Sequence, residues 1–180
     1  MGSTELRAMM KRLLAAIAWI VAWGVTATLA GEGVPTARDL QQDGAEARAR
    51  GAAVLVVFVG ARCPYCDLAL NEVLIPTSRN PEYQRKLVMR RVQTRSSQTL
   101  RDFDGKRITQ AEFAKRHGVN LVPTVMLFDH QGLSLTRPMV GITTVDHYGY
   151  ELDLAIEEAL ARIGPAQEPM PAQAAPTGSS

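Results

Sequence analysis

The two cysteines of this 180-residue chain lie three positions apart, in the segment Cys63-Pro64-Tyr65-Cys66. An apolar run, 53–59, precedes the pair, and a stretch with helical spacing follows it. Cysteines at positions i and i+3 of a helix N-terminus can close a small disulfide, and the first sulfur then faces the positive end of the helix dipole. The pair therefore indicates thiol–disulfide exchange, with Cys63 and Cys66 as candidate catalytic residues.

Other uses of a cysteine pair explain this segment less well. A disulfide across so short a loop removes little entropy from the unfolded chain, so it is a poor stabiliser. Two cysteines also fall short of the four ligands of a structural zinc site. We therefore expect no metal site, and no cofactor other than the redox-active disulfide Cys63–Cys66. A metal or cluster carrier, in which two such chains bridge one ion, stays open as an alternative.

The two sulfurs should differ in acidity. Attack on a disulfide needs a thiolate, and the pKa of a free cysteine is about 8.5. Cys63 lies beside the cation of Arg62 at the helix N-terminus, which should lower the pKa of its thiol. Cys66, one turn inside the helix, should be buried and less acidic. We expect Cys63 to attack and Cys66 to resolve the mixed disulfide, with Pro64 and Tyr65 setting the redox poise and the shape beside Cys63.

The first thirty residues differ from the rest of the chain. Lys11 and Arg12 precede an uncharged stretch, 13–30, that ends in small residues. This order is typical of a secretory signal peptide, which we predict at 1–30. An uncleaved membrane anchor is the alternative, because the apolar run is just long enough to span a bilayer. Either interpretation implies an exported chain.

The charge and composition of the remaining residues limit the functions that they can have. Residues 31–180 hold 17 basic and 17 acidic side chains, so no basic excess argues for nucleic-acid binding. This length suits one domain with one adequate core. Residues 165–180 are rich in Pro, Ala, Gln and Ser and carry one charge, so we predict a disordered tail there.

Between these ends, strand-like and helix-like segments follow one another. We expect strands at 53–59, 87–92, 125–128 and 133–140, and helices at 37–50, 64–74, 82–86, 109–117 and 145–163. Thr36 is the expected N-cap of the first helix, Pro76 should end the second, and 94–108 reads as polar loop. Arg90 and Arg91 should face solvent, and His117 should favour a helix C-terminus as a cation. The pattern predicts an α/β fold, a mixed sheet with helices on both faces.

Several of these features together resemble the thioredoxin fold. They are CPYC after a buried strand, Val122-Pro123-Thr124 before a second strand, Gly141 and a closing helix, and they span 36–163. More narrowly, DFDG at 102–105, the helix that follows it and GVNLVPTVMLFD at 118–129 resemble the periplasmic thioredoxin-like proteins encoded with bacterial sulfur-oxidation (Sox) clusters. This resemblance implies a thioredoxin-like domain at 36–163 whose central mixed sheet is flanked by helices on both faces.

The resemblance also implies a function. Pro123 should be cis, lie against the cysteine pair and present the backbone of Val122 to a substrate, which makes Val122, Pro123 and Thr124 the expected substrate-binding residues. A periplasmic, monomeric reductase of protein disulfides, supplied with electrons by a membrane partner, is then the leading interpretation. A disulfide oxidant or isomerase for folding proteins is the alternative within the same chemistry.

Two features depart from the pattern of cytosolic thioredoxins, and one is that Arg62-Cys63-Pro64-Tyr65-Cys66 stands where they carry Trp-Cys-Gly-Pro-Cys. Thioredoxins carry a buried aspartate six residues before the first active-site cysteine, and Val57 stands at that position here. Without the carboxylate, the thiol of Cys66 must lose its proton to water or to another group. CPYC is also the motif of glutaredoxins, but the sequence shows no sign of a glutathione site.

Overall fold

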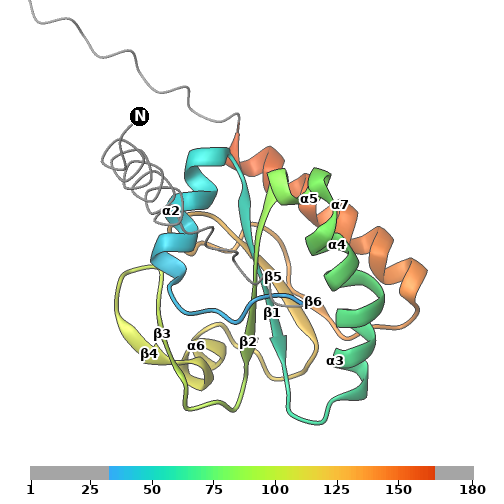
Figure 1. The fold of residues 1–180 in the computed structure, drawn as a ribbon, viewed down its shortest axis with the longest axis horizontal. Helices are drawn as coiled ribbons and strands as arrows, with labels where there is room; N and C mark the ends of the chain where they lie inside the picture. The colour runs from blue at the N-terminus through green and yellow to red at the C-terminus, as the bar shows by residue number, and fades with distance from the viewer. Residues whose placement is uncertain (1–32, 165–180) are drawn as a thin grey trace, which may run out of the picture. The chain divides into compact units, whose positions relative to one another are not determined.

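The computed structural model describes residues 33–164 (Figure 1). The predicted signal peptide at 1–30 and the predicted tail at 165–180 lie outside the described residues. The described part contains a four-stranded sheet of order β2-β1-β5-β6. Strand β1 runs parallel to β2 and antiparallel to β5, and β5 runs antiparallel to β6. The strands are β1 (Ala53–Val59), β2 (Leu87–Gln93), β5 (Thr124–Phe128) and β6 (Met139–Val140).

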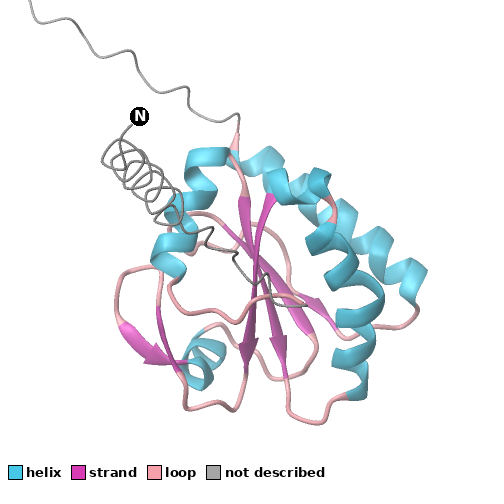
Figure 2. Ribbon diagram, viewed as in Figure 1, coloured by secondary structure: helices cyan, strands magenta, loops and turns pink. Residues whose placement is uncertain are grey.

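Helices cover both faces of this sheet, as Figure 2 shows, which confirms the predicted fold class. One face carries α7 (Val145–Ile163) and a continuous helical run of α3 (Pro64–Ala69), η1 (Leu70–Leu74) and α4 (Ile75–Arg79). The opposite face carries α2 (Leu40–Arg50) and α6 (Gln110–Arg116), and α5 (Pro81–Lys86) leads into β2.

Strand β1 lies at the centre because every one of its seven residues is buried, as the unbroken apolar run predicts. Its alternate residues enter two cores. Leu55 and Val57 pack in the core under α3 and α7, while Val54, Val56 and Phe58 pack in the core under α2 and α6. Helix α7 has the predicted bounds, and Leu154 on it is exposed. The buried residues of α7 are Tyr148, Leu152, Ile156 and Ala159.

The first described helix begins later than predicted. Asp39, not Thr36, is the N-cap of α2, and its side chain accepts a hydrogen bond from the N–H of Gln42 at 2.9 Å. The preceding residues instead bond to the edge of β2. Arg91 donates its N–H to the carbonyl of Pro35 at 2.7 Å, and its own carbonyl accepts from Ala37 at 2.8 Å. Pairing with the edge strand β2 therefore overrides the local signal for a helix N-cap at Thr36.

The second helix continues through Pro76 to Arg79, so the prediction that Pro76 ends it is wrong. Proline inside an α-helix lacks an N–H and its ring clashes with the carbonyl four residues back. The π-helix η1 widens the turn just before Pro76, and Ile75 donates its N–H to the carbonyl of Leu70, five residues back. The wider turn accommodates the proline, and the helix ends where Asn80 and Pro81 follow.

The predicted polar loop at 94–108 contains a small hairpin, β3 (Thr99–Arg101) paired with β4 (Arg107–Thr109). Its strands are three residues long, and Leu100 and Ile108 alone are buried in them, so no apolar alternation marks them in the sequence. The two buried residues pack in the core under α6. Gly105 closes the turn at a φ of 84°, a left-handed conformation that favours glycine.

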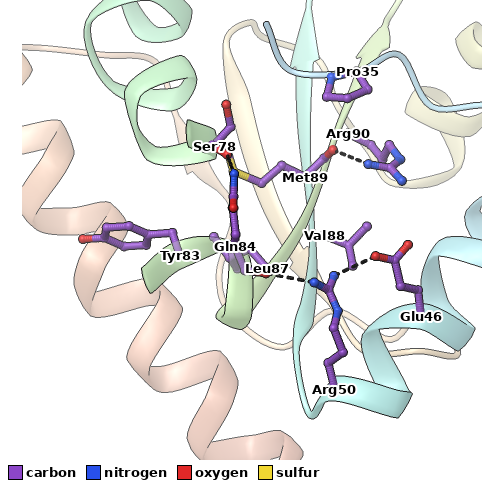
Figure 3. A pocket seen from close by; sticks show the side chains of 10 residues that line it. All are labelled: Pro35, Glu46, Arg50, Ser78, Tyr83, Gln84, Leu87, Val88, Met89 and Arg90. Atoms are coloured by element: carbon purple, nitrogen blue, oxygen red, sulfur yellow. Dashed lines mark hydrogen bonds and ion pairs between the residues drawn. The ribbon is translucent and has the colours of Figure 1, made fainter. Parts of the chain in front are cut away.

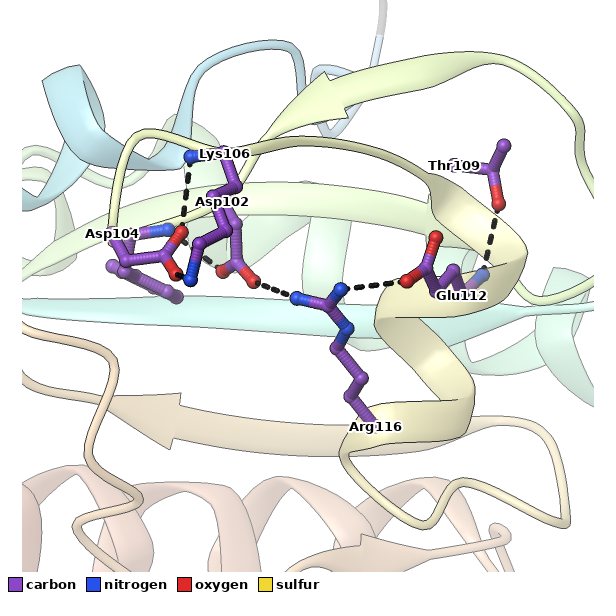
Figure 4. Close-up of polar contacts among 7 residues, drawn as sticks. Asp102, Asp104, Lys106, Thr109, Glu112 and Arg116 are labelled. Carbon is purple, nitrogen blue, oxygen red and sulfur yellow. Dashed lines mark hydrogen bonds and ion pairs between the residues drawn. The ribbon is translucent and has the colours of Figure 1, made fainter.

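An ionic contact joins this hairpin to α6, as Figure 4 shows. Arg116 donates to Asp102 at 3.4 Å and to Glu112 at 2.6 Å. Helix α6 starts where the capping pattern predicts, because the hydroxyl of Thr109 accepts from the N–H of Glu112 at 3.1 Å. The segment after α6, which leads to the site, bonds back to the helix, because Val119 donates its N–H to the carbonyl of Ala114 at 3.0 Å.

The predicted strand at 133–140 is largely absent. Only Met139–Val140 forms a strand against β5, and Ser134 makes one isolated bridge to Phe128. Pro138 has no N–H to donate, which interrupts the pairing. The chain turns between β5 and this segment, where Gly132 donates its N–H to the carbonyl of Asp129 at 3.2 Å.

Arg90 does not face solvent, and the structure corrects that prediction. Its Nε and Nη2 donate to the two carboxylate oxygens of Asp43 at 2.9 and 2.6 Å. Burial raises the pKa of Asp43, an effect that the bond to Arg90 opposes. The Nη1 of Arg90 donates to the carbonyl of Met89 at 2.8 Å. Pro35 has no N–H and therefore cannot donate a hydrogen bond to this carbonyl. Figure 3 shows Arg90 and Met89 on the wall of a cavity of about 280 Å³ at this edge of the sheet.

Candidate active site

The cysteine pair lies where β1 passes into α3. Gly60, Ala61 and Arg62 turn the chain, Cys63 is the N-cap of α3 in an extended conformation, and Pro64 occupies its first turn. Proline is favoured there because its missing N–H would be unpaired in any case. Cys63 and Cys66 form a disulfide, with their Cα atoms 5.2 Å apart.

The two sulfurs have different environments. Cys63 is half-buried, whereas Cys66 is 1% exposed and packs in the same core as Val57. The N–H of Cys66 points at the Sγ of Cys63 over 3.2 Å. In the reduced protein this N–H would stabilise a thiolate on Cys63. Cys63 is therefore the accessible sulfur, and Cys66 lies behind it.

The loop that contains Pro123 lies against the cysteines. The Val122–Pro123 peptide bond is cis, and the carbonyl oxygen of Val122 lies 4.0 Å from the Sγ of Cys63. Gly60 permits this approach, since a Cβ on it would lie 3.2 Å from a methyl group of Val122. The structure thus brings Val122 and Pro123 beside Cys63.

Neighbouring groups hold this loop in place. Thr124 donates its hydroxyl to the carbonyl of Leu121 at 2.8 Å, and Gly141 donates its N–H to the carbonyl of Pro123 at 2.8 Å. The hydroxyl of Thr124 is therefore used inside the loop, and its side chain is buried. The N–H of Val122 bonds to no other described residue. Of the three residues expected to bind substrate, Val122 offers a free backbone group.

Arg62, Pro64 and Tyr65 are exposed around Cys63. Arg62 has a φ of 54°, in the left-handed region that non-glycine residues seldom adopt. Within residues 33–164 its side chain forms no ion pair or hydrogen bond, so any influence on Cys63 acts through solvent. The ring of Tyr65 is 65% exposed and forms part of the surface beside the pair.

Sequence reasoning missed Arg91 as a neighbour of the site. In the sheet register Arg91 is opposite Val57, and it alternates with Leu87 and Met89, which pack in the core that holds Cys66. Its Nε is buried and has no hydrogen-bond partner among the described residues. Two charged residues within a short strand between apolar ones are the signal that could have indicated burial. The backbone of Arg91 thus lies beside Val57, while its Nη2 donates to the hydroxyl of Thr36 at 3.5 Å.

The histidines of the described segment contact residues other than the cysteines. The ring of His117 lies 4.4 Å from that of Phe113 and 4.8 Å from that of Phe128. Burial lowers the pKa of His117, so the imidazole is neutral at neutral pH and is not the helix-terminal cation expected from the sequence. The Nε2 of His147 lies 3.3 Å from a carboxylate oxygen of Glu151.

Residues 33–164 contain neither a candidate metal site nor a candidate membrane span. The described histidine, cysteine and acidic side chains form no group of three that could hold a metal ion. None of the described helices is long and apolar enough to cross a bilayer.

A match to a known protein family agrees with this arrangement. The family described as the thioredoxin-like domain matches residues 40–155, whereas no curated protein matches the sequence. Among solved structures, the chain is similar to Trxlp from Edwardsiella tarda EIB202, with 27% identity over 60% of this chain and 88% of that one, and a TM-score of 0.43. It is also similar to thioredoxin O2 from Arabidopsis thaliana, with 16% identity over 66% of this chain and 93% of that one, and a TM-score of 0.43.

A third similar structure is the thioredoxin of Malassezia sympodialis, with 18% identity over 71% of this chain and 94% of that one, and a TM-score of 0.42. The family match spans most of the described residues and includes both cysteines and the Val122–Pro123 loop. With its Cys63–Cys66 disulfide the chain is a thiol–disulfide oxidoreductase, and it belongs to the thioredoxin-like domain family.

Proposed function

We propose that this chain is an exported reductase of protein disulfides, in which Cys63 attacks and Cys66 resolves. The observation that carries the proposal is the difference between the two sulfurs. Cys63 is accessible, accepts the N–H of Cys66 and lies 4.0 Å from the backbone of Val122, whereas Cys66 is buried behind it. A substrate strand that bonds to Val122 would bring its own sulfur to Cys63 and not to Cys66.

The reaction balances as two successive exchanges. The thiolate of Cys63 attacks one sulfur of the substrate disulfide, the substrate S–S bond breaks, and the departing thiolate takes a proton from solvent. The thiol of Cys66 then loses its proton and attacks the Sγ of Cys63, which releases the second substrate thiolate. That thiolate also takes a proton from solvent, so two electrons have passed from the enzyme to the substrate, and the Cys63–Cys66 disulfide must be reduced again by a donor.

Export rests on the sequence of residues 1–30, with its basic start, apolar centre and small-residue end. An exported reductase needs a donor that delivers electrons across the membrane, so a membrane protein is the proposed partner, and 36–163 is the proposed catalytic unit. We propose a monomer in the periplasm, related to the thioredoxin-like proteins of sulfur-oxidation clusters. Fractionation of cells that express the full chain tests this location, and recovery of the protein in the cytosol would contradict it.

A trapping experiment tests the roles of the cysteines. Cys66→Ala should accumulate mixed disulfides with protein partners in periplasmic extract after acid quenching and alkylation, because the second exchange cannot occur. Cys63→Ala is the matched control and should trap none. Adducts on Cys63→Ala, together with none on Cys66→Ala, would reverse the two roles.

The direction of electron flow needs its own measurement. A reduction potential near −270 mV, about that of thioredoxin, would support a reductase, and one near −120 mV, about that of a strong oxidant, would support the oxidant instead. In cells, the alkylation state of Cys63–Cys66 should be reduced while the donor is present and become oxidised when it is deleted. A pair that stays oxidised in both strains would contradict the reductase.

A further inference from the structure

A small apolar cavity lies next to the Val122–Pro123 loop. Its volume is about 210 Å³, and the segment from His117 to Leu121 forms one wall while the strands β5 and β6 form the other. Leu121 and Thr124, which flank Val122 and Pro123 in the chain, both line it. The cavity therefore begins one residue away from the backbone that lies beside Cys63.

The mouth of this cavity exposes unusual apolar surface. Leu121 is 67% exposed and Val140 is 56% exposed, and the cavity deepens onto Met126, which is buried. Neither exposed side chain is needed to fill a core of the described residues. Two large aliphatic groups held open to water beside a reactive centre are typical of a surface that a partner covers.

The cavity also lacks charge. Among the described residues that line it, none carries a carboxylate, an amine or a guanidinium. Its titratable wall is His117, which is neutral at neutral pH because it is packed between Phe113 and Phe128. A charged group placed here would lose its hydration without finding an opposite charge. The site therefore suits an apolar side chain and opposes a charged one.

Size and position select the kind of occupant. Pockets for drug-sized ligands have volumes of about 300–1,000 Å³, so this cavity is suited to a side chain and not to a whole small molecule. An extended strand bonded to Val122 has side chains that alternate between its two faces, and it places residues on either side of its cysteine against the loop. Whichever of these substrate residues points toward β6 would contact Leu121 and Thr124 in the wall of the cavity.

From these observations we propose that the cavity is a specificity subsite of the disulfide reductase. It receives an apolar side chain of the substrate polypeptide within two positions of the cysteine that Cys63 attacks. This inference rests on the proposed function, since it names the substrates that the same site prefers. Leu121 and Val140 are the specificity-determining residues.

The test uses the full chain and disulfide-linked peptides that carry a fluorophore and a quencher. The peptides are identical except for Leu or Asp at one of the two positions on either side of the cysteine. Rates for each variant are divided by its rate with hydroxyethyl disulfide, which has no side chain that could reach the cavity. Leu133→Asp is the matched control, because Leu133 is 68% exposed but lies in the turn after β5, outside the cavity.

In the wild type and in Leu133→Asp, kcat/KM should favour the Leu peptide about tenfold at one of these positions. Leu121→Asp and Val140→Asp should reduce the preference to less than about threefold. The subsite is overturned if the wild type shows no preference between the peptides, or if the preference persists in both variants. In either case, reduction of hydroxyethyl disulfide would still support the reductase. Failure to reduce hydroxyethyl disulfide overturns the proposed function and the subsite together.

Discussion

At the scale of single residues, the backbone conformation and contacts of a few residues shape the site. Cys63 caps α3, so its sulfur receives the N–H of Cys66. Gly60 leaves room for Val122, and Thr124 fixes the loop from the other side. Arg62 is the exception, because its left-handed backbone conformation is one in which the β-carbon crowds the next carbonyl. The turn that delivers Cys63 therefore carries local strain.

Replacing Arg62 separates this strain from its charge. Arg62→Gly and Arg62→Ala both remove the cation, but glycine alone is relaxed at a φ of 54°. We expect urea denaturation of the oxidised protein to give a free energy of unfolding about 1 kcal/mol higher for Arg62→Gly than for Arg62→Ala. Equal stabilities would show that the turn relaxes in both variants.

The same two variants also test the charge. Arg62 is exposed, and an exposed charge interacts weakly through solvent. Both variants should therefore raise the thiolate pKa of Cys63 by less than about one unit, measured from the pH dependence of alkylation. A larger rise would mean that Arg62 folds over the reduced sulfur.

At the scale of elements, close backbone contacts decide how the helices sit on the sheet. Helix α2 approaches the turn after β5 so closely that a Cβ on Gly44 would lie 2.6 Å from the carbonyl oxygen of His130. Glycine normally weakens the interior of a helix. In the structure Gly44 is the point where α2 contacts the β5–β6 connection, and the pair of Asp43 with Arg90 fixes α2 to β2 beside it.

A pair of glycine substitutions tests this contact. Replacing glycine with alanine inside a helix normally stabilises it by about 1 kcal/mol. Gly149→Ala in α7, where an added Cβ meets nothing within 4 Å, should gain that amount. Gly44→Ala should instead lower the free energy of unfolding by about 1–3 kcal/mol, because the backbone of His130 must move. A Gly44→Ala variant as stable as Gly149→Ala would contradict the tight contact.

At the scale of the whole molecule, the sequence predicts individual strands and helices better than it predicts contacts between distant segments of the chain. The unbroken run of β1, the capping pattern of α6 and the bounds of α7 are strong local signals, and the structure confirms each. The hairpin β3–β4 and the buried pair of Arg90 with Asp43 depend on partners far along the chain, so no local pattern indicates them. The same holds for the cavity beside Leu121, which three separate segments enclose.

The stability of the whole fold should report the burial of His117. Burial holds its pKa below the usual 6.5, so the unfolded chain binds a proton that the folded chain resists. The stabilisation is complete above pH 6.5 and decreases as the pH falls through the folded-state pKa, by at most about 1.4 kcal/mol for each pH unit. The difference in unfolding free energy between wild type and His117→Gln should therefore shrink from pH 7.5 to pH 5. A constant difference would show that His117 titrates normally.

The buried side of the cysteine pair has a consequence for how long the enzyme holds a partner. Val57 is fully buried, and the buried carboxylates of the described residues, Asp43 and Asp102, pair with arginines on the other face of the sheet. The thiol of Cys66 then has no built-in base, and its deprotonation depends on the pH of the surroundings. Each captured protein would stay covalently attached for longer in acid medium than in neutral medium. The pH of the surroundings would thereby set the dwell time of the enzyme on its partners.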